Sequence, residues 1–200
     1  MSAVGVPVPG GDPAIGEVLI SEAEIADRIA ALGARITADY AGRTPLLVSV
    51  LKGSLVFVAD LMRAVDGPLE IDFLAVSSYG EATRSSGVVR ILKDLDAEVT
   101  GRDVLVVEDI VDSGLTLSYL LDRLRSQNPA SLATCTLILR TAGCGDDPDR
   151  PVCGDLPIDY VGFRLPPSFV VGYGLDAGQR YRNLPYIARY VVPESPGPVG

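Results

Sequence analysis

Hydrophobic residues follow two different periods along the chain, and each period predicts one type of element. Isoleucine and leucine recur every three or four residues from Ile25 to Ile36, which is the spacing of one helix face. Ser21 and Glu24 stand three residues apart just before this stripe, in the arrangement of a capping box. A helix is therefore expected over residues 22–40.

Short apolar runs rich in β-branched residues alternate with further helical stripes along the rest of the chain. The run at 104–107 is continuous, which is typical of a strand buried on both faces of a parallel sheet. Strands alternating with helices in this way predict an α/β fold. The patterns predict strands at 46–51, 69–76, 88–92, 104–107, 132–139, 160–163 and 169–173, and helices at 55–65 and 117–124.

The segments that connect these elements are polar or rich in Gly and Pro. Residues 77–86 and 140–155 are predicted to be loops. The two ends, 1–14 and 193–200, combine Gly, Pro and Val with little charge and are expected to be flexible tails. Two hundred residues suit one domain, which we expect over residues 15–192.

Charge and residue usage exclude several classes of function. The formal net charge of −9 argues against broad binding of nucleic acid, which needs clustered Lys and Arg. The chain has no His, so histidine triads and histidine metal sites are excluded, and proton transfer falls to carboxylates, Lys, Tyr or water. Cys135, Cys144 and Cys153 lack C-x-x-C spacing and fit reduced thiols in the cytoplasm. We expect no membrane association, since no apolar run approaches the ~20 residues of a membrane span.

Two adjacent carboxylates follow the strand predicted at 104–107. Glu108 and Asp109 come where that strand would leave the core, and open α/β sheets bind ligands at the carboxyl ends of their strands. The small and hydroxyl residues of 112–116 come next and can aim backbone N–H groups at an anion ahead of a helix. The segment has neither the G-x-x-x-x-G-K-S/T of a P-loop nor the G-x-G-x-x-G of a dinucleotide fold. Taken alone, it also fits a plain buried strand, an acidic turn and an N-capped helix.

As a whole, the run from Val104 to Thr116 resembles the phosphoribosyl-diphosphate (PRPP) signature of type I phosphoribosyltransferases. Lys52-Gly53 and the segments 77–90 and 160–186 resemble the hypoxanthine-guanine branch of that family. The resemblance runs from about residue 19 to 191. It implies a parallel sheet flanked by helices, with a small hood formed by the N-terminal segment and residues from about 155 to 192.

The resemblance also implies a role for each matching residue. Asp112 would be the general base that removes a proton from the purine. Glu108 and Asp109 would hold the ribose hydroxyls and, through water, Mg²⁺, and Asp176 would hold a second Mg²⁺. The other implied roles are 5′-phosphate binding by Ser113, Gly114, Leu115 and Thr116, pyrophosphate binding by Lys52, Gly53 and Arg182, purine binding by Arg140, Phe169 and Val170 beside Asp176, and a lid that includes Ser78 and Tyr79.

The implied reaction belongs to purine salvage. Hypoxanthine, and also guanine, would react with PRPP to give IMP or GMP and pyrophosphate, with Mg²⁺ as cofactor. The implied partners are these small molecules, and the family commonly forms homodimers or homotetramers. In this family the peptide bond before the lysine that matches Lys52 can be cis, a form that costs ~3 kcal/mol without proline.

Three positions depart from the pattern of the family. Arg140 stands where the family has a lysine that donates to the purine 6-oxo group, and these two side chains are not interchangeable. Pro167 replaces an acidic residue, and Ala177 replaces an aromatic one. The arginine at position 140 leaves open the preference among hypoxanthine, guanine and xanthine.

Two alternatives to a hypoxanthine-guanine enzyme follow from the same residues. One is a regulator on the same fold that senses PRPP or nucleotide and binds RNA or DNA, against which the negative net charge argues. The other is a transferase for a different base, such as xanthine, adenine or a pyrimidine. The 6-amino group of adenine would face the donors of Arg140 without an acceptor.

Overall fold

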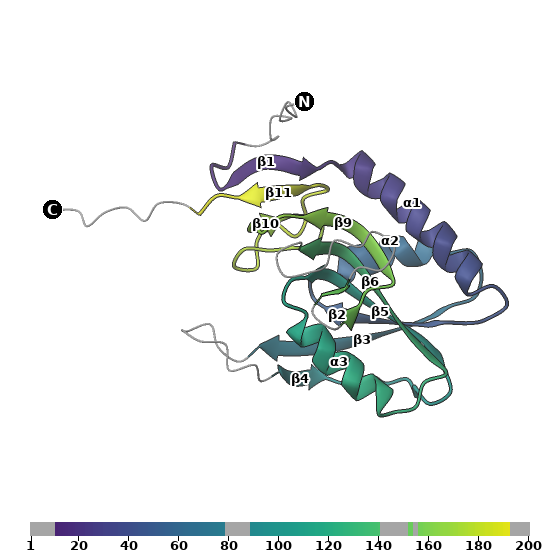
Figure 1. The fold of residues 1–200 in the computed structure, drawn as a ribbon. Helices are drawn as coiled ribbons and strands as arrows, with labels where there is room; N and C mark the ends of the chain where they lie inside the picture. The colour runs from purple at the N-terminus through teal and green to yellow at the C-terminus, as the bar shows by residue number, and fades with distance from the viewer. Residues whose placement is uncertain (1–10, 79–88, 141–151, 154–155, 193–200) are drawn as a thin grey trace.

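A computed structural model of the chain describes residues 11–78, 89–140, 152–153 and 156–192, and Figure 1 shows its fold. Tyr79 of the predicted lid and most of the predicted loop at 140–155 lie outside the described residues. Within the described part, no helix combines the length and the apolar character that crossing a membrane requires.

The centre of the molecule is a six-stranded sheet in the order β4-β3-β2-β5-β6-β9. Neighbouring strands are parallel, except that β3 and β4 are antiparallel. This arrangement confirms the predicted α/β fold with its parallel sheet. The strands are β2 (Leu46–Leu51), β3 (Glu70–Ser78), β4 (Val89–Lys93), β5 (Asp103–Val111), β6 (Ser131–Arg140) and β9 (Tyr160–Leu165).

Helices cover both faces of this sheet (Figure 1). On one side lie α1 (Glu22–Asp39) and α2 (Leu55–Ala64), and on the other side lies α3 (Leu115–Arg125). Side chains of β2 alternate between the two cores, since Leu47 packs with α1 and α2 whereas Val48 packs with α3. Both faces of the strand are buried, which explains why its sequence is nearly continuously apolar rather than alternating, with Ser49 as the one polar residue.

The ends of α1 and α3 show how local residues set helix boundaries. Ser21 caps α1 as predicted, because its side chain accepts the N–H of Glu24 and the Glu24 carboxylate accepts the N–H of Ser21 at 2.8 Å. The start of α3 differs from the expected Leu117. Gly114 adopts φ 75° and serves as the N-cap, so the helix begins at Leu115.

The strand β5 extends further than its apolar run predicted. Its ladder with β2 ends at the pair Ser49–Val107, but its ladder with β6 continues to Val111–Leu139. Glu108 and Asp109 therefore lie within the strand rather than after it, which corrects the prediction. Beyond Val107 this part of β5 is paired with β6 and no longer with β2.

A smaller sheet lies at the opposite end of the molecule from α3 (Figure 1). It contains β1 (Ile15–Ile20), β11 (Ile187–Tyr190) and β10 (Val170–Val171) in that order, all antiparallel. The hydrophobic pattern did not predict β1 or β11. A further two-stranded sheet pairs β7 (Val152–Cys153) with β8 (Leu156–Pro157).

Two expectations about the hood and the N-terminal tail need correction. We expected the whole segment from about 155 to 192 in the hood, but β9 pairs with β6 and forms an edge of the main sheet. Asp12 and Ala14 were assigned to the flexible tail. Instead, Ala14 is buried, and the Asp12 carboxylate accepts a hydrogen bond from the Tyr181 hydroxyl at 2.9 Å. The division into one domain over 15–192 remains a prediction.

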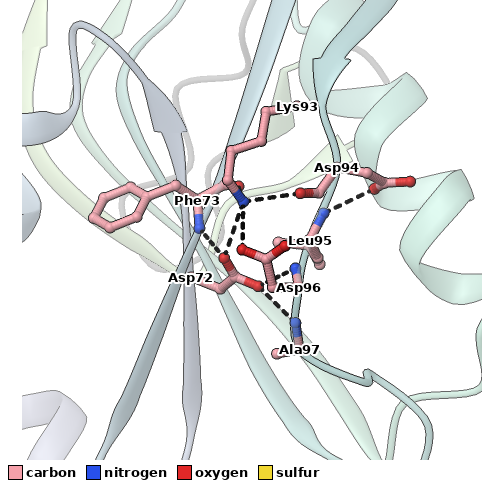
Figure 2. Close-up of polar contacts among 7 residues, drawn as sticks. All are labelled: Asp72, Phe73, Lys93, Asp94, Leu95, Asp96 and Ala97. Atoms are coloured by element: carbon pink, nitrogen blue, oxygen red, sulfur yellow. Dashed lines mark hydrogen bonds and ion pairs between the residues drawn. The ribbon is translucent and has the colours of Figure 1, made fainter.

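A buried carboxylate organises the outer part of the main sheet (Figure 2). Asp72 on β3 accepts the backbone N–H groups of Phe73, Asp96 and Ala97 at 2.7, 2.7 and 2.8 Å. Burial raises the pKa of Asp72, but these three donors and the nearby Lys93 ammonium outweigh burial and hold the pKa below its ordinary value.

The Lys93 ammonium at the end of β4 completes this network. Its Nζ atom lies 3.5 Å from Asp72 Oδ1 and 3.0 Å from Asp96 Oδ2. The same atom donates to the carbonyl oxygens of Phe73 and Asp94 at 3.1 and 2.9 Å. The network thereby joins β3, the end of β4 and the turn that follows it (Figure 2).

We predict that Asp72→Asn lowers the free energy of unfolding by roughly 1–3 kcal/mol near neutral pH, because an amide cannot accept all of these hydrogen bonds. The pKa of Asp72 is lower in the folded than in the unfolded chain. Asp72 therefore stabilises the fold fully at pH values above its pKa in the unfolded chain. This stabilisation is lost as the pH falls through its pKa in the folded chain. Urea titrations near neutral pH and at strongly acidic pH measure the difference.

Asp122→Asn is the matched control, since the Asp122 side chain is 71% exposed in its pair with Arg125. Such a pair contributes about 0–1 kcal/mol. An equal loss at both positions, or a loss at Asp72 that does not shrink in acid, would contradict the prediction.

Candidate active site

The first part of the site is the pair of adjacent carboxylates within β5. Glu108 is buried, and burial together with the charge of Asp109 raises its pKa well above the ordinary value. Burial also raises the pKa of Asp109 to about 6, although the backbone N–H of Ile110 donates to its Oδ1 atom at 3.0 Å. A cation or hydrogen-bond donor that approaches either side chain would therefore stabilise its ionised form.

The turn from β5 into α3 forms the second part. Asp112 and Ser113 are exposed, and the left-handed conformation of Gly114 directs the chain into the first turn of α3. Residues 108 and 110–117 line a cavity of about 120 Å³ at this point. The first backbone N–H groups of a helix have no partner within the helix, and the helix dipole favours negative charge there. The cavity therefore suits a phosphate group.

Glycines bring the Lys52–Gly53 turn against the carboxylates. The peptide bond between Leu51 and Lys52 is cis. A Cβ atom on Gly53 would lie 1.6 Å from Asp109 Oδ2, so a side chain at this position would displace the Asp109 carboxylate. A Cβ atom on Gly174 would lie 2.1 Å from the carbonyl oxygen of Gly53. The β2–α2 turn is thus enclosed between β5 and the loop after β10.

A polar cluster lies on that loop and reaches across to Lys52. Arg182 Nη2 is 2.6 Å from Asp176 Oδ1, and the backbone N–H of Gln179 donates to Asp176 Oδ2 at 2.7 Å. Gln179 Oε1 accepts from Lys52 Nζ at 3.4 Å and from Arg182 Nη2 at 3.3 Å. The sequence reasoning gave no role to Gln179, which links the two predicted pyrophosphate ligands Lys52 and Arg182.

The residues predicted to bind the purine surround a second cavity. This cavity of about 210 Å³ is lined by Asp109, Ile110, Arg140, Phe169, Val170, Leu175 and Asp176. Phe169 is 52% exposed, and its ring packs against Tyr190 with centroids 5.2 Å apart. The Phe169 ring can therefore offer a face to a flat ligand while Tyr190 supports it.

Arg140 connects this cavity to the turn before α3. Its Nη1 atom is 3.0 Å from Asp112 Oδ2, and its Nη2 atom donates to the carbonyl oxygen of Ser168 at 2.9 Å. The guanidinium thus joins the predicted general base to the residue before Phe169. Arg140 and Phe169 line this cavity, and Asp112, which is 61% exposed and lines the neighbouring cavity at the start of α3, contacts it through Arg140.

The structure brings most of the predicted site residues together. Ser78 is the last residue of β3, and its predicted lid partner Tyr79 lies outside the described residues. A larger cavity of about 620 Å³ lies away from the carboxylates, between α1, α2 and residues 182–185. Of the predicted site residues, Arg182 lines it.

The carboxylates fit the requirements of Mg²⁺. Hard oxygen ligands suit this ion, which is usually bound through one or two carboxylates together with water and substrate phosphates. Glu108 and Asp109 are adjacent, and their raised pKa values show that a nearby positive charge would be favourable. Among the described residues there is no group of three or more potential ligands. The pair would therefore suit Mg²⁺ that is also held by a diphosphate.

Comparisons with known proteins agree with this geometry. The family profile described as "Phosphoribosyl transferase domain" matches residues 19–177. The chain belongs to the phosphoribosyltransferase family. This finding confirms the family that the PRPP-like signature indicated.

Several members of the phosphoribosyltransferase family resemble the chain over most of its length. It is 51% identical over 173 residues to a hypoxanthine-guanine phosphoribosyltransferase of Bacillus subtilis, covering 86% of this chain and 92% of that enzyme. It is 54% identical over 173 residues to a "Bifunctional protein TilS/HprT" of Listeria monocytogenes, covering 86% of this chain. The chain spans about a quarter (26%) of the length of that bifunctional relative.

A solved phosphoribosyltransferase structure shares the fold. A crystal structure of a hypoxanthine-guanine phosphoribosyltransferase from Bacillus anthracis, with HEPES in its active site, aligns with a TM-score of 0.80 at 43% identity. The alignment covers 88% of this chain and 99% of that chain. The type I phosphoribosyltransferase fold predicted from the sequence is therefore confirmed.

We predict that Asp109→Asn stabilises the protein above about pH 6. The pKa of Asp109 is about 6 in the folded protein and about 4 for an unfolded aspartate. Folded protein therefore loses stability as the pH rises between these values, because the charge that forms is buried. The variant avoids this loss, so its advantage should grow across this range to about 1–3 kcal/mol. Urea titrations at several pH values measure it.

Asn retains an oxygen that accepts the N–H of Ile110, so the variant mainly removes the charge. The exposed control Asp122→Asn should show no such growth with pH. A variant that is less stable than the native chain at neutral pH would contradict the prediction.

Proposed function

We propose that this phosphoribosyltransferase transfers the ribose 5-phosphate group of PRPP to hypoxanthine or guanine. The products are IMP or GMP and pyrophosphate, as in purine salvage. The observation that carries the proposal is the meeting of three features at one end of β5: buried carboxylates, a phosphate cavity at a helix start and a base-sized cavity beside Phe169. Relatives named hypoxanthine-guanine phosphoribosyltransferase at 51–53% identity support it.

In this proposal the ends of PRPP are held by different elements. Ser113, Gly114, Leu115 and Thr116 hold the 5′-phosphate by backbone N–H groups and hydroxyls at the start of α3. Glu108 and Asp109 hold the ribose hydroxyls. Lys52, Gly53 and Arg182 face the pyrophosphate, where Gln179 already links the two cations.

The purine occupies the cavity beside β10. Phe169 stacks on the ring, Val170 contacts its edge through the backbone, and Arg140 donates to the 6-oxo group. Asp112 takes the proton of the attacking ring nitrogen as that nitrogen bonds to the anomeric carbon and the bond from carbon to pyrophosphate breaks. The 3.0 Å contact between Asp112 and Arg140 supports this arrangement, since Arg140 lines the purine cavity.

The other residues stabilise the transition state and exclude water. One Mg²⁺ held through Glu108 and Asp109, and a second held through Asp176, would neutralise negative charge on the diphosphate leaving group. The carboxylates of Glu108 and Asp109 also stabilise positive charge that develops on the ribose. The lid of Ser78 and Tyr79 is proposed to exclude water from this reactive sugar.

The remaining expectations stay proposals. We propose that the chain forms a homodimer or homotetramer and acts in the cytoplasm, binding neither nucleic acid nor membrane. The net charge of −9 supports the proposal that the chain does not bind nucleic acid. The cysteine pattern supports a reducing compartment.

The first test is nucleotide formation from hypoxanthine, guanine, xanthine and adenine in parallel, with PRPP and Mg²⁺. We expect turnover of the 6-oxopurines, and Asp112→Asn should lower kcat about 10²- to 10⁴-fold because the amide cannot take the proton. Asn retains an oxygen for Arg140, so the KM for PRPP should change little. Asp122→Asn should match the native chain.

Absence of turnover with every base, despite binding of PRPP, would favour the nucleotide-sensing regulator instead. Equal turnover of adenine and hypoxanthine would contradict the base assignment.

Arg140 tests the selection of the base. Arg140→Met should lower kcat/KM for hypoxanthine about tenfold or more, because one hydrogen bond from a charged donor contributes about 1.5–3 kcal/mol. The kcat/KM for adenine should fall less, so the ratio of kcat/KM for hypoxanthine to kcat/KM for adenine should decrease. Arg140→Lys should be intermediate, since an ammonium lacks the planar fork that reaches both Asp112 and Ser168.

Arg63→Met serves as the control, because the Arg63 side chain is 80% exposed on α2. If Arg140→Met left the ratio of hypoxanthine to adenine unchanged, Arg140 would not contact the 6-oxo group.

A further inference from the structure

The loop after β10 contains a tyrosine in an unusual backbone conformation. Gly172, Tyr173 and Gly174 have φ values of 102°, 50° and 96° in succession. Glycine adopts such values readily, but a bulky residue does so at a cost and only where its surroundings enforce it. Tyr173 is nevertheless 6% exposed and well anchored, which indicates that its side chain has a specific function in the loop.

The side chain of Tyr173 crosses from the loop to α2. Its hydroxyl donates to Asp60 Oδ2 at 2.6 Å. Burial, and then the hydrogen bond and charge of Asp60, raise the pKa of Tyr173, so its phenol remains a donor across the physiological range. The other oxygen of Asp60 lies 4.0 Å from Arg63 Nη1, in an exposed pair that contributes little.

The backbone of the loop at Tyr173 and Gly174 is hydrogen-bonded to the segment that carries Arg182, a proposed pyrophosphate ligand. The N–H groups of Tyr173 and Gly174 donate to the carbonyl oxygens of Leu184 and Arg182 at 2.8 and 2.9 Å. Arg182 Nη1 donates back to the carbonyl oxygen of Gly174 at 2.7 Å. Gly174 in turn packs on Gly53, with no room for a side chain between them.

The hydrogen bond thus joins two parts of the chain that carry the proposed pyrophosphate ligands. Asp60 lies on α2, directly after the Lys52–Gly53 turn, and Tyr173 lies on the loop that continues to Asp176 and Arg182. Neither Asp60 nor Tyr173 lines the phosphate cavity or the base cavity. Both line the larger cavity of about 620 Å³ behind the site.

We propose that Tyr173 and Asp60 are positioning residues, whose hydrogen bond sets the distance between the Lys52–Gly53 turn and the loop bearing Asp176 and Arg182. The alignment of the cationic groups on a diphosphate depends on this distance. The inference rests on the proposed function and deepens it. Tyr173 and Asp60 would influence diphosphate binding without contacting the substrate themselves.

A matched tyrosine distinguishes positioning from simple packing. Tyr160 is 4% exposed, and its hydroxyl donates to Asp39 Oδ2 at 2.8 Å, between the start of β9 and the end of α1. It lines none of the three cavities. Tyr160→Phe therefore removes the same chemical group from a similar contact outside the site.

The experiment compares Tyr173→Phe, Asp60→Ala, Asp60→Asn and Tyr160→Phe in the full chain. Loss of one hydrogen bond of about 1–1.5 kcal/mol corresponds to about a tenfold change. We expect Tyr173→Phe and Asp60→Ala to raise the KM for PRPP about tenfold, with a smaller change in the KM for hypoxanthine. Asp60→Asn retains an oxygen acceptor and should stay near the native value. Tyr160→Phe should lower the melting temperature without changing the KM for PRPP.

Amide hydrogen exchange at residues 172–182 provides a second readout that does not require activity. Exchange there should be faster in Tyr173→Phe than in the native chain and unchanged in Tyr160→Phe. A native chain with no turnover would count against the proposed function, and the exchange result would still test the contact. An unchanged KM in Tyr173→Phe in an active enzyme, an equal rise in Tyr160→Phe, or an equal loss in Asp60→Asn and Asp60→Ala would each overturn the inference.

Discussion

The burial of two neighbouring carboxylates in β5 is the constraint on which the rest of the site depends. Charged groups lose hydration when they are buried, and this loss is tolerated where other groups compensate for it. In this chain the raised pKa values of Glu108 and Asp109 show that the protein alone compensates incompletely. A ligand that brings cations and hydroxyl donors would stabilise these two buried charges. The buried carboxylates therefore lower the stability of the free protein and favour binding of such a ligand.

The same constraint explains the glycines around the site. Asp109 lies against the turn after β2, and a side chain at Gly53 would displace its carboxylate. The loop after β10 then approaches Gly53 closely enough to require Gly174. The turn after β2 is therefore packed between the Asp109 side chain and the backbone of the loop after β10. Such close packing leaves little freedom for the turn bearing Lys52, which suits a site that must hold a flexible diphosphate in one geometry.

Much of the fold could be predicted from hydrophobic periodicity, and the errors have physical causes. The stripe of α1 and its capping box are local signals, and both were predicted correctly. The strand β11 was missed because its four residues are too few to show a period. The strand predicted at 169–173 is present as β10 but contains only two residues. The placement of β9 beside β6 depends on pairing between distant segments, which no local pattern encodes.

The candidate site divides in the same way. The residues from Glu108 to Thr116 are contiguous, and their order alone suggested carboxylates followed by a phosphate cavity. The contact of Tyr173 with Asp60 joins positions 113 residues apart, and the bridge from Lys52 to Gln179 joins positions 127 apart. Contacts of this kind become visible only when the chain is folded, because each partner by itself looks like an ordinary polar residue.

The network around Asp72 has a consequence for how separate molecules meet. β4 lies at one edge of the main sheet, and Leu92 on this strand is 63% exposed. An open edge with exposed apolar residues is a template on which another chain can add a strand. Lys93 is drawn inward by Asp72, and the pairing of β3 with β4 shifts register beside it, so the edge is short and irregular. The residues that fasten this strand to its own sheet therefore also limit aggregation through strand addition.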